Sequence, residues 1–195
     1  MYDQSDFIIE DGVLVEYTGH GGDVVVPEGV EVLGDYCFRK CNILQRNSVE
    51  MNSVSLPKSL TKIGNLVFLH CEGLTEVKIP DRVTEIGDNA FELNRQLSKV
   101  KLPKKLIHLG KYAFAGCGIN SITLPKELKT IGEGAFMNNN LQKLILPDGI
   151  EIIEKRAFDG QLYATFALYV KKDTPAEKAA KKYAKKGKPK IVVIE

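Results

Sequence analysis

The sequence predicts an α/β solenoid, a right-handed superhelix of stacked repeats with a parallel β-sheet on one face and short helical or 3₁₀ turns on the other. Prolines recur mostly every 22–23 residues; a glycine usually follows each proline by seven residues and a phenylalanine always follows it by eleven. Six registers that agree at the phenylalanine offset, five of them also at the glycine offset, indicate one unit repeated along the chain. The prolines are Pro27, Pro57, Pro80, Pro103, Pro125 and Pro147. The glycines are Gly34, Gly64, Gly87, Gly110 and Gly132, with Glu154 in the sixth position. The phenylalanines are Phe38, Phe68, Phe91, Phe114, Phe136 and Phe158.

Each proline follows a short segment in which apolar and polar residues alternate. Before Pro80, for example, Val77 and Ile79 flank Lys78. Alternation with a period of two predicts a strand that turns its apolar side chains to the core and Lys78 to solvent. Proline has no N–H to continue the ladder, so the strand is expected to end there.

After each proline, aliphatic residues stand three and six positions further on, and the glycine follows. This spacing fits one helical or 3₁₀ turn, and the glycine predicts a backbone with positive φ. The phenylalanine is then expected to point inward and stack on its equivalents along the axis. The aliphatic residues at the first position are Leu60, Val83, Leu106, Leu128 and Ile150. Those at the second are Ile63, Ile86, Leu109, Ile131 and Ile153.

Both ends of the array depart from the repeat in ways that predict caps. At the front, Phe7–Glu10 and Val13–Tyr17 alternate around Asp11-Gly12, which predicts a type I′ hairpin. At the back, residues 174–177 (TPAE) form a capping box that starts a helix. An alanine stripe with Tyr183 is the expected apolar face of this helix, Gly187 is expected to end it, and Ile191–Ile194 to form a last strand. We expect the caps to cover the sheet edges.

The chain is therefore interpreted as one solenoid domain over residues 1–195. Residues 1–20 form the N-terminal cap, residues 21–171 six repeats, and residues 172–195 the C-terminal cap. The first two prolines are 30 residues apart, which places an insertion near residues 42–50. Such insertions emerge as loops, and this one either carries function or is a tolerated bulge.

The repeat reads approximately L-x-x-V-x-I-P-x-x-L-x-x-I-G-x-x-A-F-x-x-C and resembles the BspA-type leucine-rich repeat family found in bacterial surface and uncharacterised proteins. The resemblance covers residues 21–171, and the opening residues 6–30 are similar to the family's N-terminal cap hairpin. It implies a right-handed leucine-rich-repeat superhelix that serves as an interaction scaffold. The sequence departs from the better-known leucine-rich consensus, which places Asn or Cys after the strand where this chain has Pro.

Charge and hydropathy narrow the class of protein. There is no apolar run of 18 residues and no signal-peptide pattern at the start, which predicts a cytoplasmic protein as written, or a secreted or surface one if a signal precedes it. Residues 1–60 carry ten acids and four bases, and residues 171–190 carry nine lysines and two acids. The C-terminal lysines lie on the polar side of a thinly apolar helix without interleaved aromatic residues. We therefore expect no nucleic-acid binding and no membrane insertion.

The cysteines are predicted to be core residues with free thiols. Cys41, Cys71 and Cys117 share the position three residues after phenylalanine, and Cys37 takes the position used elsewhere by alanine. A zinc site from Cys37, Cys41, His70 and Cys71 lacks the paired spacing typical of such sites, so no metal is expected. A Cys41–Cys71 disulfide is within reach of stacked repeats but is not expected.

No catalytic motif is present, and the three histidines are scattered, which predicts a protein that is not an enzyme and needs no cofactor. The better candidate is the outward face of the strands before each proline. We expect Lys78, Lys99, Lys101 and Lys143, flanked by Ile145 and Tyr169, to bind an acidic protein or carbohydrate ligand. The alternative is a sheet surface whose lysines only discourage aggregation.

In the first of two outward columns stand Val25, Ser55, Lys78, Lys101, Thr123, Ile145 and Tyr169. The second contains Asp23, Ser53, Glu76, Lys99, Ser121 and Lys143. A monomer is expected. A structural module that self-associates, with the acidic front of one copy against the basic back of another, is the alternative function.

Overall fold

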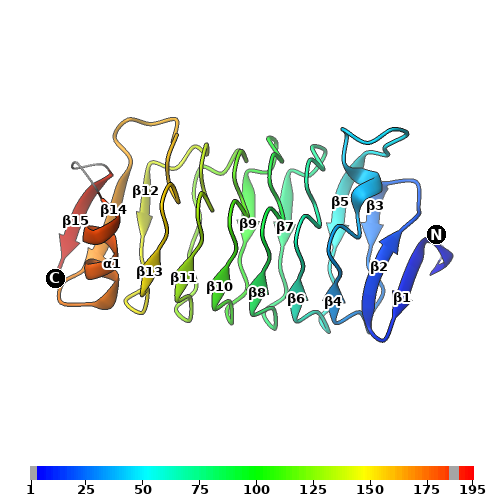
Figure 1. The fold of residues 1–195 in the computed structure, drawn as a ribbon, viewed down its shortest axis with the longest axis horizontal. Helices are drawn as coiled ribbons and strands as arrows, with labels where there is room; N and C mark the ends of the chain where they lie inside the picture. The colour runs from blue at the N-terminus through cyan, green and yellow to red at the C-terminus, as the bar shows by residue number, and fades with distance from the viewer. Residues whose placement is uncertain (1–3, 185–188) are drawn as a thin grey trace.

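The computed structural model describes residues 4–184 and 189–195. The chain winds into coils stacked along one axis, with its two termini at opposite ends (Figure 1). A typical coil passes through the strand before the proline, a tight turn, a second strand of two residues and a six-residue turn that carries the phenylalanine. The repeated coil is the one that the prolines, glycines and phenylalanines predict.

Two rows of parallel strands run along the stack. The strands before the prolines form three separate sheets, ordered β3-β5, β7-β9 and β12-β14-β15. They are β3 (Gly22–Val25), β5 (Met51–Ser55), β7 (Glu76–Lys78), β9 (Lys99–Lys101), β12 (Lys143–Ile145) and β14 (Ala167–Lys171), with β15 (Lys190–Ile194) added at the C-terminal end. The second row joins a terminal hairpin in one sheet of eight strands. Its short strands are β4 (Val32–Leu33), β6 (Lys62–Ile63), β8 (Glu85–Ile86), β10 (His108–Leu109), β11 (Thr130–Ile131) and β13 (Ile152–Ile153).

The tight turn that the sequence predicted after each proline is present, but the second aliphatic position lies in a short strand that the sequence did not predict. In the second repeat, the N–H of Leu60 donates to the carbonyl of Pro57 (3.2 Å), which closes a single turn before β6 begins. The next residues bond to neighbouring coils, with Ile63 in register with Ile86. Pairing between coils satisfies backbone groups that a 3₁₀ turn would have satisfied within its own coil. In the described chain the 3₁₀ helices are Gln4–Asp6 and Arg39–Cys41.

The repeated glycines are needed for close approach of neighbouring coils, and the predicted positive φ at these positions is wrong. A Cβ atom on Gly110 would lie 2.5 Å from the carbonyl carbon of Gly87, so no side chain fits between the two backbones. The left-handed conformation occurs two residues later, at Leu66 (φ 58°) and Tyr112 (φ 52°) among others. Residues of several types occupy that position, so residue type alone does not predict the positive φ there.

The phenylalanines stack along the axis as predicted. Successive ring centroids are 5.0, 4.9, 4.9, 5.8 and 5.9 Å apart, and the rings are nearly parallel. Backbone bonds hold the turns in the same register, for example from the N–H of Phe91 to the carbonyl of Ala113 (2.8 Å). The column continues into both caps through Phe7, Tyr17, Phe166 and Tyr183. It forms the spine of one continuous hydrophobic core.

The position three residues after phenylalanine is buried, as predicted, and its amides also bond to the backbone. The side-chain NH₂ of Asn139 donates to the carbonyls of Phe114 (2.7 Å) and Phe136 (3.1 Å). Its Oδ1 accepts from the N–H of Ile119 (3.1 Å). The thiol of Cys117 lies 3.2 Å from the carbonyl of Phe91. The two asparagines, Asn94 and Asn139, thus each bond the phenylalanine carbonyl of their own coil and that of the preceding coil.

The stack changes where the repeat shortens from 23 to 22 residues. The lost residue lies between the buried Asn or Cys and the next proline, and the phenylalanine centroids separate from 4.9 to 5.8 Å from Phe114 onward. The segment Ser121–Leu124, expected to be a strand, is not one. Among the described residues no backbone hydrogen bond joins this segment to β9 or β12. The first row of strands is therefore interrupted at its centre.

The N-terminal hairpin is confirmed. Strands β1 (Phe7–Glu10) and β2 (Val13–Tyr17) pair antiparallel. Asp11 and Gly12 between them both have positive φ (47° and 77°), as a type I′ turn requires. Strand β2 then pairs parallel with β4, so the hairpin continues the eight-stranded sheet.

The C-terminal cap has the predicted helix and strand. Helix α1 (Pro175–Tyr183) begins at Thr174, whose Oγ1 accepts from the N–H of Glu177 (3.3 Å). The helix ends at Tyr183, and Gly187, the predicted terminator, lies outside the described residues. Strand β15 (Lys190–Ile194) pairs parallel with β14. In the described chain no strand pairs with the other edge of β15, and helix α1 contacts β13, β14 and β15. That the caps cover the sheet edges stays a prediction.

Candidate interaction surface

The first row of strands turns the predicted residues outward. Lys78 and Lys101 are exposed and lie directly opposite each other on β7 and β9. On the next sheet, Ile145 is 62% exposed and lies opposite the half-buried Tyr169. The alternation of side chains along each strand thus turns these residues outward, as the sequence predicted. Wherever the strands pair, the residues of each predicted outward column lie opposite each other.

The six predicted residues do not form one cluster. Lys99 and Lys101 lie on β9, whereas Lys143 lies on β12 opposite Ala167, beyond the unpaired Ser121–Leu124 segment. The surface is therefore divided into a basic part on β7–β9 and an apolar part on β12–β14. The interruption coincides with the shortened repeat and could not be seen in a single strand pattern.

Acidic groups on this face are mostly paired. The carboxylate of Glu76 lies 4.0 Å from the ammonium of Lys99, and Asp81 lies 2.9 Å from Lys104. Hydrogen bonding to Lys104 is the main cause that lowers the pKa of Asp81 below its ordinary value. Lys78 and Lys101 take part in no ion pair with any described residue.

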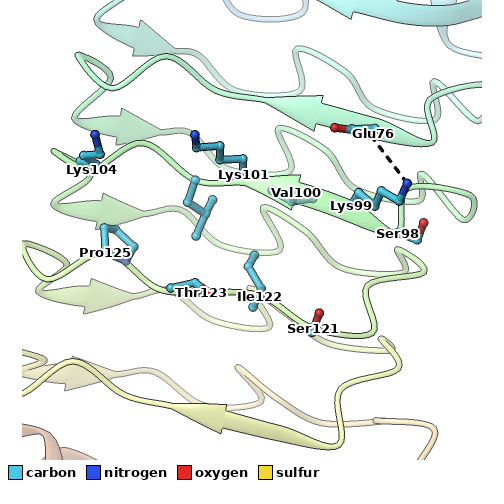
Figure 2. A pocket seen from close by; sticks show the side chains of 11 residues that line it. Glu76, Ser98, Lys99, Val100, Lys101, Lys104, Ser121, Ile122, Thr123 and Pro125 are labelled. Atoms are coloured by element: carbon cyan, nitrogen blue, oxygen red, sulfur yellow. Dashed lines mark ion pairs between the residues drawn. The ribbon is translucent and has the colours of Figure 1, made fainter.

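Open hollows lie where the first row of strands is interrupted. The first, of about 560 Å³, lies between β9 and Ser121–Leu124, and Lys99, Lys101 and Lys104 surround it (Figure 2). Ser98, Ser121 and Thr123 provide its hydroxyl groups. The second, of about 540 Å³, lies between β5 and β7 and is bordered by Lys58, Lys78, Arg82 and Lys101. Lys101 thus lies on the wall between the two hollows.

A third hollow of about 440 Å³ lies between Ser121–Leu124 and β12. Lys143 and Ile145 line it together with Lys126, whereas Tyr169 lines none of the three. It is the most apolar of the three hollows, and it lies on the Ile145 side of the face. This agrees with the division of the face into a basic part on β7–β9 and an apolar part on β12–β14.

Sequence reasoning missed three cations that border the hollows. Lys58, Arg82 and Lys104 follow their prolines by one or two residues, in turns that were not assigned to the face. The signal that could have found Lys58 and Lys104 is a third column, one residue after each proline, which contains Lys58, Asp81, Lys104 and Lys126. The tight turn after proline keeps this column beside the strand.

The insertion at residues 42–50 forms a loop between Cys41 and β5. Leu44 at its tip is 69% exposed and Ile43 is 43% exposed. The loop is held by the N–H of Ile43, which donates to the carbonyl of His70 (3.2 Å), and by that of Val49, which donates to Lys40 (2.9 Å). Whether this loop carries function stays a prediction.

All four cysteines are buried and free, as predicted. Burial raises the pKa of Cys41 and of Cys117 to about 12, and it also raises the pKa of Cys37 and Cys71. In the part of the chain that the structure describes, no group of three or more His, Cys, Asp or Glu side chains could hold a metal ion. The thiols therefore serve the core.

The predicted basic helix face is present in part. Lys181 forms an ion pair with Glu177 (2.6 Å), and Lys182 is exposed in the last turn of α1. The remaining lysines of this segment, 185 and 186, lie outside the described residues. Within the described chain, no helix is long and apolar enough to span a bilayer.

The stacked parallel strands, the short turns and the exposed strand face define a leucine-rich repeat solenoid, a class of proteins that are generally interaction scaffolds. A family model described as "BspA type Leucine rich repeat region (6 copies)" matches residues 45–165, more than half of the chain. The chain belongs to this BspA-type leucine-rich repeat family, as the repeat pattern indicated. No curated protein matches the chain.

Solved bacterial structures share the fold. A leucine-rich repeat protein of T. pallidum is 24% identical, with a TM-score of 0.73 over 95% of this chain and 96% of that one. The pneumococcal vaccine antigen PcpA is 20% identical, with a TM-score of 0.66 over 95% of this chain and 45% of that one. A leucine-rich repeat protein of Bacteroides ovatus ATCC 8483 is 24% identical, with a TM-score of 0.59 over 76% of this chain. The match spans only 37% of that protein's length. At these identities the likenesses show the fold alone.

Proposed function

We propose that this chain is a non-enzymatic binding scaffold whose strand face recognises a protein or carbohydrate ligand. The face consists of Lys78, Lys99, Lys101, Lys143, Ile145 and Tyr169. The observation that supports this most directly is the placement of Lys78 and Lys101, exposed and without ion-pair partners in the described chain, at the border of open hollows. Cations without partners in a hollow attract and orient an anionic ligand.

The experiment is a pull-down with the immobilised chain, before and after Lys78, Lys99 and Lys101 are replaced by Glu. A control variant reverses three lysines elsewhere, Lys111 and the helix residues Lys178 and Lys182, and so changes the net charge equally. We expect the unaltered chain and the control variant to recover the same partner. The variant with Lys78, Lys99 and Lys101 replaced by Glu is expected not to recover it. Thermal unfolding of both variants checks that they fold. Equal recovery by all three proteins would rule out this face.

Carbohydrate ligands need a separate measurement, because a protein pull-down does not detect them. We expect any glycan that binds on an array to lose binding with the same triple substitution and to keep it with the control. Binding that both variants retain would assign the glycan to another surface.

A second candidate function is self-association, and the exposed ends of the stack favour it. The outer edge of β15 has no paired strand in the described chain, and its Val193 and Ile194 are 43% and 42% exposed. Ile8 on β1, at the other end, is 42% exposed. Sedimentation at low and high salt tests this role: assembly that dissolves in high salt supports an acidic front meeting a basic back, and a monomer in both conditions excludes it.

A further inference from the structure

The pair Lys78 and Lys101 departs from the way this protein uses charge elsewhere. In the two other pairs of charged residues that lie opposite each other on described strands, the charges are unlike. One is Lys62 with Glu85, whose charged atoms are 3.1 Å apart. One pair further along β7 and β9, Glu76 lies opposite Lys99. Lys78 and Lys101 also lie opposite each other on neighbouring strands, whose backbones are about 4.8 Å apart, but their like charges repel each other. Placing like charges directly opposite lowers stability, so their position calls for another explanation.

The surroundings of the pair are also basic. The two hollows that share Lys101 are lined by six cations and two acids: Lys58, Lys78, Arg82, Lys99, Lys101 and Lys104 against Glu76 and Asp81. The two acids are already engaged by Lys99 and Lys104, respectively. An anion placed between Lys78 and Lys101 would convert their repulsion into two attractions.

The cations form a row across the strands. Strands β7 and β9 pair with each other, and β5 and Ser121–Leu124 flank them in the adjacent coils. The hollows lie at these two boundaries, so their cations extend along the stack axis, from Lys58 beside β5 to Lys104 beside Ser121–Leu124. A linear ligand that lies along this axis and carries regularly spaced anionic groups matches such a row.

We propose that the basic hollows on either side of β7–β9 bind an acidic peptide segment in extended conformation, with one of its carboxylates held between Lys78 and Lys101. This inference rests on the proposed function, since it specifies the partner of the same face. The hollows extend from the coil of Ser55 to that of Thr123, three spacings of the stack or about 14 Å. An extended peptide covers that length in about five residues, with side chains on one side about 6.6 Å apart. Three acids at alternate positions therefore fit the cations.

A peptide is favoured over an acidic glycan by the residues that line the hollows. No aromatic ring lines either hollow, so the flat apolar surface on which a sugar ring would stack is missing there. The apolar part of the face, with Ile145 and Tyr169, then contacts residues of the partner beyond the acidic segment.

The test uses the full chain and a capped, fluorescein-labelled seven-residue peptide of alternating glutamate and threonine. Fluorescence anisotropy at low salt is compared for this peptide and its glutamine counterpart. We expect the acidic peptide alone to bind, and its affinity to fall about tenfold when Lys78 and Lys101 are both replaced by Gln. The control pair Lys111→Gln and Lys178→Gln removes the same charge and is expected to leave the affinity unchanged.

A second measurement separates a binding role from a structural one. Because the two lysines repel each other, the Lys78→Gln and Lys101→Gln variant is expected to unfold at an equal or higher temperature than the unaltered chain at low salt. The acidic peptide is expected to raise the unfolding temperature of the unaltered chain and not that of the variant. An unfolding temperature lowered by the substitutions would assign the lysines a structural role and overturn the proposal.

The remaining outcomes distinguish this inference from the proposed function. If the acidic peptide fails to bind while the pull-down still depends on Lys78, Lys99 and Lys101, the face binds a partner of other chemistry and this inference is wrong. Tighter binding of an oligogalacturonate than of the peptide would assign the hollows to an acidic glycan instead. If neither the peptide nor any partner depends on these lysines, both proposals fail.

Discussion

The ring of Phe114 lies parallel to that of Phe91, with centroids 4.9 Å apart and planes inclined by 6°. On its other side the ring of Phe136 is 5.8 Å away, at an angle of 7°. Phe114 is fully buried and stands where 23-residue repeats give way to 22-residue repeats. The phenylalanine column therefore continues without a break where the repeat length changes. The first row of strands is interrupted at this same place.

Replacing Phe114 by alanine is expected to lower the free energy of unfolding by about 3–5 kcal/mol, because it leaves a cavity in the middle of the column. Phe114→Leu, the matched control, fills most of the space and is expected to cost less. Urea denaturation followed by circular dichroism measures both. A cost below about 1 kcal/mol for the alanine variant would show that the column is not the source of stability.

Two buried asparagines, Asn94 and Asn139, are expected to contribute unequally to the free energy of unfolding. Asn139→Ala is expected to cost about 2–4 kcal/mol, because it leaves the carbonyls of Phe114 and Phe136 and the N–H of Ile119 without their bonds. Asn94→Ala is expected to cost less. Its Oδ1 has no hydrogen-bond partner among the described residues, and Cys117 also contacts the carbonyl of Phe91 that Asn94 bonds.

Denaturant titration of both asparagine variants tests this order. The half-buried Asn140 follows Asn139 directly, and Asn140→Ala serves as the control with an expected change below about 0.5 kcal/mol. Equal losses for Asn94 and Asn139 would mean that volume, and not hydrogen bonding, decides the cost.

The glycines that lie between neighbouring coils are expected to tolerate substitution less well than a glycine in an open turn. Gly110→Ala is expected to destabilise the chain by about 1–3 kcal/mol, because the added Cβ would lie 2.5 Å from the backbone of Gly87. Gly149→Ala is the control, since the nearest atom is the flexible Nζ of Lys129 at 3.2 Å and its φ is not positive. Thermal unfolding of the two variants should differ clearly; a tolerated Gly110→Ala would contradict the close contact between coils.

Burial of the thiols predicts their reactivity. In the folded chain at pH 8 we expect none of the four cysteines to react rapidly with a thiol reagent, since burial both blocks access and raises the pKa of Cys41 and Cys117 to about 12. In denaturant without a reducing agent, four thiols should react. A count of two or none there would reveal disulfides.

The same pKa values predict loss of stability in alkali. Thiols in the unfolded chain ionise near their ordinary pKa of 9.0, whereas Cys41 and Cys117 in the folded chain stay protonated up to about pH 12. The unfolded state therefore binds fewer protons between these limits, and the free energy of unfolding falls as pH rises above 9. Each such cysteine contributes at most about 1.4 kcal/mol per pH unit.

Comparison with a Cys41→Ala, Cys117→Ala variant isolates this effect from the titration of lysines and tyrosines. Its free energy of unfolding is expected to decrease less steeply between pH 8.5 and 10.5. Parallel curves for the two proteins would show that the buried thiols do not cause the alkaline loss.

The amino-acid sequence alone determined the repeated coil, the stacked phenylalanines, the buried cysteines and the outward lysines. These follow from residue type and period, because the side-chain direction along a strand is a local property. Only the tertiary structure decided the role of Gly110, the positive φ of Tyr112, the second row of strands and the hollows around Lys101. Each of these depends on how one coil meets the next, and such a contact joins residues more than 20 positions apart.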